Sequence, residues 1–188
     1  RLAWTGIAPS HRLKQAVDEL MDQLPNTLPV GYESEILLDL PEWLRTITQS
    51  LSHGVVLFID YGYSREAFYH PDRRAGTLVC HYRHRAHFDP FIWPGLTDLS
   101  AFVDFSALAD AAQGLGLDVG QFSTQALFVL SSQVHDSFAS ISDEQERLER
   151  LSEFKRLTLP SEMGEKFRVM ALMRNHNTPL LDFSSSIK

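Results

Sequence analysis

The stretch Gly54-Val55-Val56-Leu57-Phe58-Ile59-Asp60-Tyr61-Gly62 decides the fold class of this 188-residue chain. Its five consecutive apolar residues show no alternation, which predicts a strand over 55–59 that is buried on both faces, as strands of parallel sheets are. Ligands of open parallel sheets gather at the carboxyl ends of strands. Asp60 is therefore a candidate ligand-binding residue. The alternative is an ordinary polar strand end in which Gly62 makes a turn.

Helices and further strands alternate outward from this stretch. The 3.6-residue apolar period predicts a helix over 10–24 that Ser10 caps, and a second helix from Pro41. The second is expected to turn Trp43, Leu44, Ile47 and Leu51 inward. Two more helices are expected, one after Asp104 and one from the capping-box pattern 142–145 to about Leu157. Strands are expected over 77–83, 122–130 and 167–173. This order predicts an α/β fold in one domain over 1–183, with a frayed tail over 184–188.

Composition excludes several classes of partner. The net charge of −7 argues against nucleic acid or an anionic membrane surface, because both reward positive patches. No apolar run approaches the roughly 18–20 residues that span a bilayer. Cys80 is the only cysteine, so no intrachain disulfide can form. We therefore expect a globular protein with neither a nucleic-acid nor a membrane partner.

Three histidines, His81, His84 and His87, recur at every third position with Asp89 nearby. Clustered histidines can bind zinc, and a metal hydrolase is one hypothesis. The spacing is poor, because on one continuous strand His81 and His87 share a face while His84 points away. We therefore expect no metal. The preferred interpretation is a substrate-facing loop in which a histidine can serve as an acid or base.

Carboxylates elsewhere are candidates for binding a cationic substrate. Glu35 lies between the first two predicted helices and could face the same crevice as Asp60, or lie in a solvated loop. Asp98 and Asp104 flank a short apolar stretch. A helix cap is the simpler interpretation of Asp104. Glycine-rich dinucleotide or phosphate loops and a serine nucleophile elbow are absent, so nucleotidyl and hydrolase chemistries lack support.

The chain resembles the MidA-like family of S-adenosylmethionine-dependent methyltransferases. Each matching piece is short, but their order and spacing over most of the chain are specific. The matching segments are 31–36 (GYESEI), 54–63 (GVVLFIDYGY), 69–71 (YHP), 76–78 (GTL), 82–87 (YRHRAH), 94–95 (PG), 98–99 (DL), 103–108 (VDFSAL), 124–126 (TQA) and 159–167 (LPSEMGEKF).

The resemblance implies the C-terminal half of a Rossmann-like, seven-stranded methyltransferase sheet. Strand 55–59 would be the fifth strand, and 122–130 and 167–173 the sixth and seventh, with the last antiparallel. Residues 63–103 would be an insertion over the active site. The family binds S-adenosylmethionine on its first strands, which this chain lacks, so the cofactor-binding residues are unknown and the chain alone is expected to be inactive.

The resemblance also implies a function, methyl transfer to arginine of a protein substrate. Its mitochondrial members are complex I assembly factors, so the expected location is mitochondrial in a eukaryote and cytoplasmic in a bacterium. Asp60, Glu35 and His84 are the predicted catalytic residues. The predicted substrate contacts are Tyr61, Gly62, His87, Asp98 and Asp104. The alternative function is a non-catalytic assembly module that forms a homodimer through an exposed sheet edge at 55–59.

Overall fold

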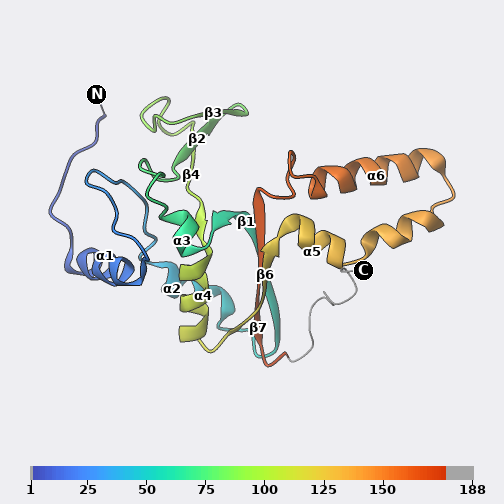
Figure 1. The fold of residues 1–188 in the computed structure, drawn as a ribbon, viewed down its shortest axis with the longest axis horizontal. Helices are drawn as coiled ribbons and strands as arrows, with labels where there is room; N and C mark the ends of the chain where they lie inside the picture. Colours follow the sequence, from blue (N-terminus) through green and yellow to red (C-terminus); the bar gives the residue numbers. More distant parts are fainter. Residues whose placement is uncertain (1, 177–188) are drawn as a thin grey trace. The chain divides into compact units, whose positions relative to one another are not determined.

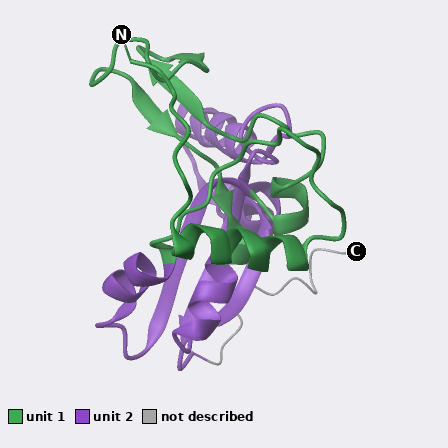
Figure 2. Cartoon of the chain, turned by 90° about the vertical axis from the view of Figure 1, so that its left-hand side faces the viewer, with its two compact units in different colours: residues 1–40, 63–107 green, residues 41–62, 108–188 purple. Residues whose placement is uncertain are grey.

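A computed structural model describes residues 2–176. The chain divides into two compact units (Figure 2): unit 1 comprises residues 1–40 and 63–107, and unit 2 comprises residues 41–62 and 108–188. The predicted insertion over 63–103 falls within unit 1, and one domain over 1–183 stays a prediction. The predicted tail over 184–188 lies outside the described residues. Within that described part, none of the helices is both long and apolar enough to cross a bilayer.

Unit 2 is built on strands β1 (Gly54–Tyr63), β6 (Asp118–Thr124) and β7 (Phe167–Arg174), with β7 between the other two (Figure 1). β7 runs antiparallel to both neighbours. Its register with β1 runs from Gly54 opposite Arg174 to Tyr61 opposite Phe167. The strands predicted over 55–59 and 167–173 are therefore confirmed, as is an antiparallel last strand. Their places as fifth and seventh strands of seven stay predictions.

Burial differs sharply between these strands. Val169, Met170, Ala171 and Leu172 of β7 are all buried, because β7 has a partner strand on each side and cover on each face. On β1, Leu57 is 45%, Ile59 50% and Tyr61 41% exposed. The prediction that 55–59 is buried on both faces is therefore wrong for the described residues. These three alternate residues share one face, and no described residue covers it fully.

Five helical segments accompany these strands: α2 (Leu40–Thr48), α4 (Phe105–Gly114), α5 (Gln125–Ser131), the 3-10 helix η1 (Val134–Ser140) and α6 (Glu144–Thr158). In α2 only Leu44 and Thr48 are buried. Trp43 packs on Phe58 of β1, with 5.9 Å between ring centroids, yet it stays about half exposed. The inward orientation predicted for this helix is therefore confirmed for Leu44 but wrong for Ile47, which is also exposed.

The predicted strand over 122–130 is wrong after Thr124. The Thr124 hydroxyl accepts a hydrogen bond from the Leu127 amide and so begins helix α5. The apolar run after Thr124 has no alternation, so periodicity alone does not distinguish a buried strand from a helix. The helix predicted to end near Leu157 is confirmed as α6, but Asp143, rather than Ser142, is its cap.

Unit 1 carries α1 (His11–Gln23), α3 (Arg65–Phe68) and a three-stranded antiparallel sheet. The sheet comprises β2 (Val79–Tyr82), β3 (Arg85–His87) and β4 (Asp98–Ser100), in the order β3-β2-β4; a two-residue strand, β5 (Val103–Asp104), follows. Ser10 caps α1 by accepting from the Leu13 amide, as predicted. Asp39 pairs with Arg12 of α1, whose guanidinium also donates to the Leu38 carbonyl. These contacts connect α1 to the chain that precedes α2.

Candidate functional site

Glu35 anchors the segment at Thr77 and Leu78, which lies inside the predicted insertion. Its carboxylate accepts hydrogen bonds from the amides of Thr77 (3.0 Å) and Leu78 (3.1 Å) and from the Thr77 hydroxyl (3.0 Å). The Thr77 hydroxyl in turn accepts from the Phe102 amide at 3.0 Å. Charge-assisted hydrogen bonds of this kind are about twice as strong as neutral ones. Glu35 therefore connects three segments that are distant in sequence.

The backbone at Gly76 and the Tyr69 side chain both lie close to Glu35. A Cβ atom at Gly76 would displace the Glu35 carboxylate, and the φ of Gly76, +69°, favours glycine because other residues rarely adopt it. The Tyr69 hydroxyl donates to the Glu35 carbonyl at 3.2 Å. Burial, with a smaller effect from Asp104, raises the pKa of Tyr69 well above its ordinary value, so the phenol stays neutral. A catalytic role for Glu35 stays a prediction, whereas its hydrogen bonds already show a positioning role.

Asp60, Tyr61 and Gly62 lie on β1 of unit 2. The strand continues to Tyr63, and its pairing with β7 extends as far as Tyr61. Asp60 is exposed, and its Oδ1 accepts from the Tyr61 amide at 2.7 Å. The Tyr61 ring lies 4.1 Å from that of Phe167, and Gly62 is buried. The carboxylate is thus oriented by its own backbone and accessible to a ligand.

The three histidines do not come together. Arg83 and His84 form a tight turn with φ values of +49° and +63°, which reverses the chain between β2 and β3. His87 therefore pairs with Cys80, while His81 pairs with Ala86 and Asp98. Directly paired residues share a face, so His81 and His87 lie on opposite faces of this sheet. The predicted shared face is wrong, because the pattern of one continuous strand was applied across a turn.

Geometry in the described residues gives no support to a metal centre. No group of three or more histidine, cysteine, aspartate or glutamate side chains in residues 2–176 is placed to hold a metal ion. His84 is exposed in its turn. Asp98 is exposed on β4 opposite His81. The metal-hydrolase hypothesis therefore lacks a site in this part of the chain.

Asp104 caps helix α4. Its Oδ1 accepts from the amides of Ser106 (2.9 Å) and Ala107 (3.0 Å), which confirms the capping interpretation. Substrate contacts by Asp104, as by His84, His87, Asp98, Tyr61 and Gly62, stay predictions. A cap of this kind is worth about 0.5–2 kcal/mol.

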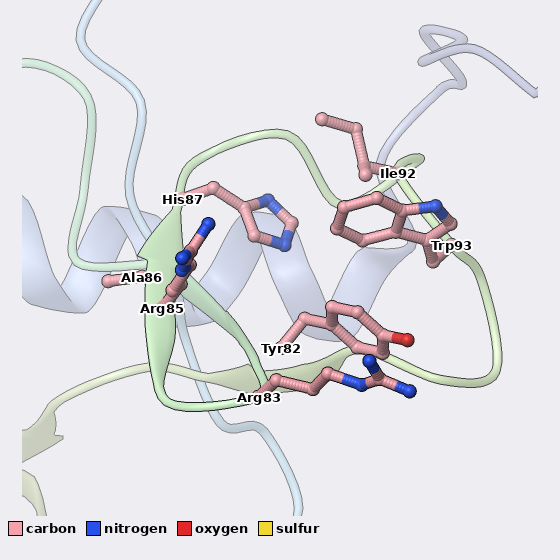
Figure 3. A pocket seen from close by; sticks show the side chains of 7 residues that line it. All are labelled: Tyr82, Arg83, Arg85, Ala86, His87, Ile92 and Trp93. Carbon is pink, nitrogen blue, oxygen red and sulfur yellow. The ribbon is translucent and has the colours of Figure 1, made fainter.

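Sequence reasoning missed the pocket in which His87 lies. Tyr82, Arg83, Arg85, Ala86, His87, Ile92 and Trp93 line a cavity of about 560 Å³ within unit 1 (Figure 3). Tyr82 and Trp93 face each other with ring centroids 4.5 Å apart. One sequence feature could have indicated this pocket: Trp93 directly precedes Pro94-Gly95, a pair that marks a turn.

Residues 2–123 match a protein family described as "Putative S-adenosyl-L-methionine-dependent methyltransferase". The chain belongs to this family. The resemblance inferred from the short segments above is thereby confirmed. The match includes Glu35, the Asp60-Tyr61-Gly62 segment and the whole of the Tyr82–Trp93 pocket.

Two similar proteins are named as arginine methyltransferases. The chain is 32% identical over 124 residues to the mitochondrial protein arginine methyltransferase NDUFAF7 of Mus musculus, covering 64% of the chain and 26% of that relative. Against the protein of the same name from Bos taurus it is 30% identical over 140 residues, covering 69% and 30%. The matched region thus spans less than a third of each of these two relatives.

Solved structures extend the similarity to nearly the whole chain. An uncharacterised protein from Burkholderia thailandensis matches with a TM-score of 0.80 and 36% identity, over 96% of this chain and 49% of that one. A Burkholderia thailandensis protein of the same superfamily, with S-adenosyl-homocysteine bound, matches with a TM-score of 0.79 and 36% identity, over 96% and 47%. This chain therefore spans about half the length of the structures it resembles.

Proposed function

We propose that this chain forms the substrate-side, C-terminal half of a longer S-adenosylmethionine-dependent enzyme that methylates arginine in a protein. The observation that carries the proposal is the crystal structure with S-adenosyl-homocysteine bound, whose fold matches 96% of this chain. S-adenosyl-homocysteine is what remains of the methyl donor after transfer. The relatives named as protein arginine methyltransferases support arginine as the acceptor and a protein as the substrate. They also support a mitochondrial location in a eukaryotic host, whereas a cytoplasmic location in a bacterium stays a prediction.

The described residues do not compose a site for the methyl donor. An adenosine cofactor on an α/β sheet needs a glycine-rich turn after a strand and an acidic partner for the ribose. Here β1 leads through Ser64 directly into α3, and β6 leads through Thr124 directly into α5. We therefore assign the main cofactor contacts to sequence outside this chain and derive no step that passes through the cofactor.

Asp60 is the first candidate for contact with the reacting arginine. A guanidinium stays charged up to a pH of about 12, so its site should supply a carboxylate that orients it and accepts a proton late in the transfer. Asp60 Oδ1 is held by the Tyr61 amide, which fixes the plane of the carboxylate while Oδ2 remains able to accept. Both oxygens of Glu35 already accept hydrogen bonds. Asp98 remains a further candidate carboxylate and His84 a candidate polar residue; both are exposed and lie in unit 1, whereas Asp60 lies in unit 2.

Calorimetric titration of S-adenosyl-homocysteine tests the division between cofactor and substrate sides. We expect no heat of binding with this chain and saturable binding with a protein extended upstream. Binding by this chain alone would refute the proposed division. If the extended protein also fails to bind, the methyltransferase assignment itself is refuted.

The role of Asp60 needs its own comparison. In the extended protein, Asp60→Asn should lower turnover at least tenfold, because about 1.4 kcal/mol of lost orientation suffices for that factor. Asp118→Asn, an exposed change at the start of β6, is the matched control. Mass spectrometry of the product, from substrates with either arginine or lysine at the target position, identifies which side chain accepts the methyl group. Equal turnover in both variants would eliminate Asp60 as a catalytic residue.

The exposed face of β1 favours one alternative, a non-catalytic interaction module. Leu57, Ile59 and Tyr61 present apolar surface of the kind that marks a contact with another protein segment. In the proposed enzyme the remaining half covers this face. In the alternative a second copy covers it, which predicts a dimer. A monomer in gel filtration at high protein concentration would count against the dimer.

A further inference from the structure

The pocket of unit 1 has two aromatic walls and a fixed frame. Tyr82 comes from β2, and Trp93 comes from the loop that follows β3 (Figure 3). The carbonyl of Trp93 accepts from the amides of Leu96 (2.9 Å) and Thr97 (3.2 Å), and the Thr97 hydroxyl donates to the Ile92 carbonyl at 2.8 Å. This hydrogen-bonded turn holds the tryptophan opposite the tyrosine ring.

The backbone of Trp93 is in an unfavourable conformation. Its φ is +50°, in the left-handed region that bulky side chains rarely adopt. Such a residue costs about 1–3 kcal/mol and clusters at binding sites, where the surroundings enforce it. More than half of the Trp93 side chain is nevertheless exposed. The fold therefore tolerates backbone strain at a residue whose large aromatic ring is exposed.

His87 lies beside this ring with unsatisfied hydrogen-bonding capacity. Its ring stands perpendicular to Trp93, with centroids 6.3 Å apart. Both ring nitrogens are buried, and neither has a hydrogen-bond partner in the described residues. A buried polar group without a partner costs about 1–3 kcal/mol. A ligand that moves the Trp93 ring aside and supplies a polar group to His87 removes that cost.

Two cations flank the pocket. Arg83 lies over the Tyr82 ring, with its guanidinium carbon 5.4 Å from the centroid, and Arg85 is exposed on β3. Neither forms an ion pair within the described part of the chain. The segment 82–93 holds these two arginines and one acidic residue, Asp89, and so has a net charge of +1 in a chain whose net charge is −7. The charge complementarity favours an anionic partner.

The surface around the pocket indicates that the partner is a protein segment. Phe88, Leu96 and Leu99, all from the same region, are exposed by 81%, 68% and 54%. Exposed apolar side chains are frequent at protein-interaction sites, and tryptophan, tyrosine and arginine dominate the energetics of such interfaces. A small anion could pair with the two arginines, but it would leave Phe88, Leu96 and Leu99 exposed to water.

We propose that the Tyr82–Trp93 pocket binds an acidic, aromatic-containing segment of the protein substrate. The aromatic side chain would pack against the exposed side of the Trp93 ring, which is in contact with Tyr82 on its other side, and a neighbouring carboxylate would pair with Arg83 or Arg85. The inference rests on the proposed function for the identity of the partner. The pocket does not bind the reacting arginine, because Arg83 and Arg85 would repel its charge.

Peptide binding to this 188-residue chain tests the pocket without a methyl donor. The probe is a fluorescein-labelled peptide with the core Glu-Phe-Asp-Glu, and its counterpart has the core Lys-Phe-Lys-Lys. Fluorescence anisotropy should show that the acidic peptide binds at least about tenfold more tightly, because one charge-assisted hydrogen bond contributes enough free energy for that ratio of dissociation constants. Equal affinities, or no binding of the acidic peptide, would overturn the proposal.

Substitutions in the pocket test whether the acidic peptide binds there. Arg85→Glu and Trp93→Ala should each weaken acidic-peptide binding about tenfold or more, while Arg147→Glu, the same charge reversal at an exposed position of α6, should leave it unchanged. Arg85 is exposed, so its reversal keeps the fold and covers the case in which Trp93→Ala misfolds. An unchanged affinity in Arg85→Glu refutes the site. Self-association that disappears in Arg85→Glu would identify a second copy as the occupant and also refute it.

Kinetics of the extended enzyme separate this inference from the proposed function. Arg85→Glu should raise KM for the protein substrate and leave kcat and S-adenosyl-homocysteine affinity unchanged. If the extended protein has no methyltransferase activity but the peptide result holds, the proposed function fails and the site stands. Normal activity with an unaltered KM in Arg85→Glu would eliminate the site and leave the function intact.

Discussion

Replacing Glu35 by alanine should release the segment at Thr77 and Leu78 within the insertion. The change removes the acceptor of two backbone amides and one hydroxyl, those of Thr77 and Leu78. Thr77 is only 8% exposed, so water replaces the carboxylate incompletely. Each buried amide left without a partner costs about 1–3 kcal/mol. Because the hydroxyl can rotate to a new partner, we expect a total cost of about 3 kcal/mol for the two amides.

Hydrogen exchange of the Thr77 and Leu78 amides measures this loss locally. A cost of about 3 kcal/mol corresponds to exchange faster by roughly a factor of 10². Glu35→Gln keeps one acceptor oxygen, so its effect should be about 1 kcal/mol, or roughly fivefold. Glu33→Ala, an exposed glutamate two positions away, is the matched control and should leave the exchange of both amides unchanged.

The same variants distinguish anchoring from catalysis. Exchange of the Thr77 amide at equal rates in Glu35→Ala and in the unmodified chain would refute the anchoring role. In the extended enzyme, an anchor alone predicts that Glu35→Gln keeps most of its turnover. A large loss of turnover in Glu35→Gln without faster exchange would instead support the predicted catalytic role of Glu35.

Three further outcomes are expected. Gly164→Ala should destabilise the chain by about 1–3 kcal/mol in urea unfolding, because its Cβ would lie 2.2 Å from the Thr158 carbonyl oxygen; Gly120→Ala, which meets only a flexible methionine side chain, should cost clearly less. Asp104→Ala should cost about 1 kcal/mol and Asp104→Asn much less, because asparagine also caps; equal losses would contradict the cap. Burial raises the pKa of Tyr69, so the folded state keeps a proton that the unfolded state loses above about pH 10. The unfolding free energy should therefore fall as pH rises beyond 10, by up to about 1.4 kcal/mol per pH unit, and Tyr69→Phe should remove this contribution.

Local patterns were sufficient for much of the fold. Ser10 and Asp104 satisfy amides one turn ahead of them, so their capping roles follow from neighbouring sequence. The apolar stretches of β1 and β7 likewise mark strands wherever they pack. Thr124 carries a capping signal of the same kind, but the apolar run that follows it fits a buried strand equally well by periodicity.

The candidate site depended much more on tertiary structure. The sequence by itself determined an α/β chain, its family, and the carboxylates and histidines worth testing, because these follow from residue type and short-range spacing. Only the tertiary structure decided that Glu35 binds the segment at Thr77 and that Trp93 stands over Tyr82, because each contact joins residues whose distance in space no local period encodes. Hairpin reversal at Arg83 and His84 likewise separated His81 from His87, since pairing register, rather than spacing along the chain, decides which side chains share a face.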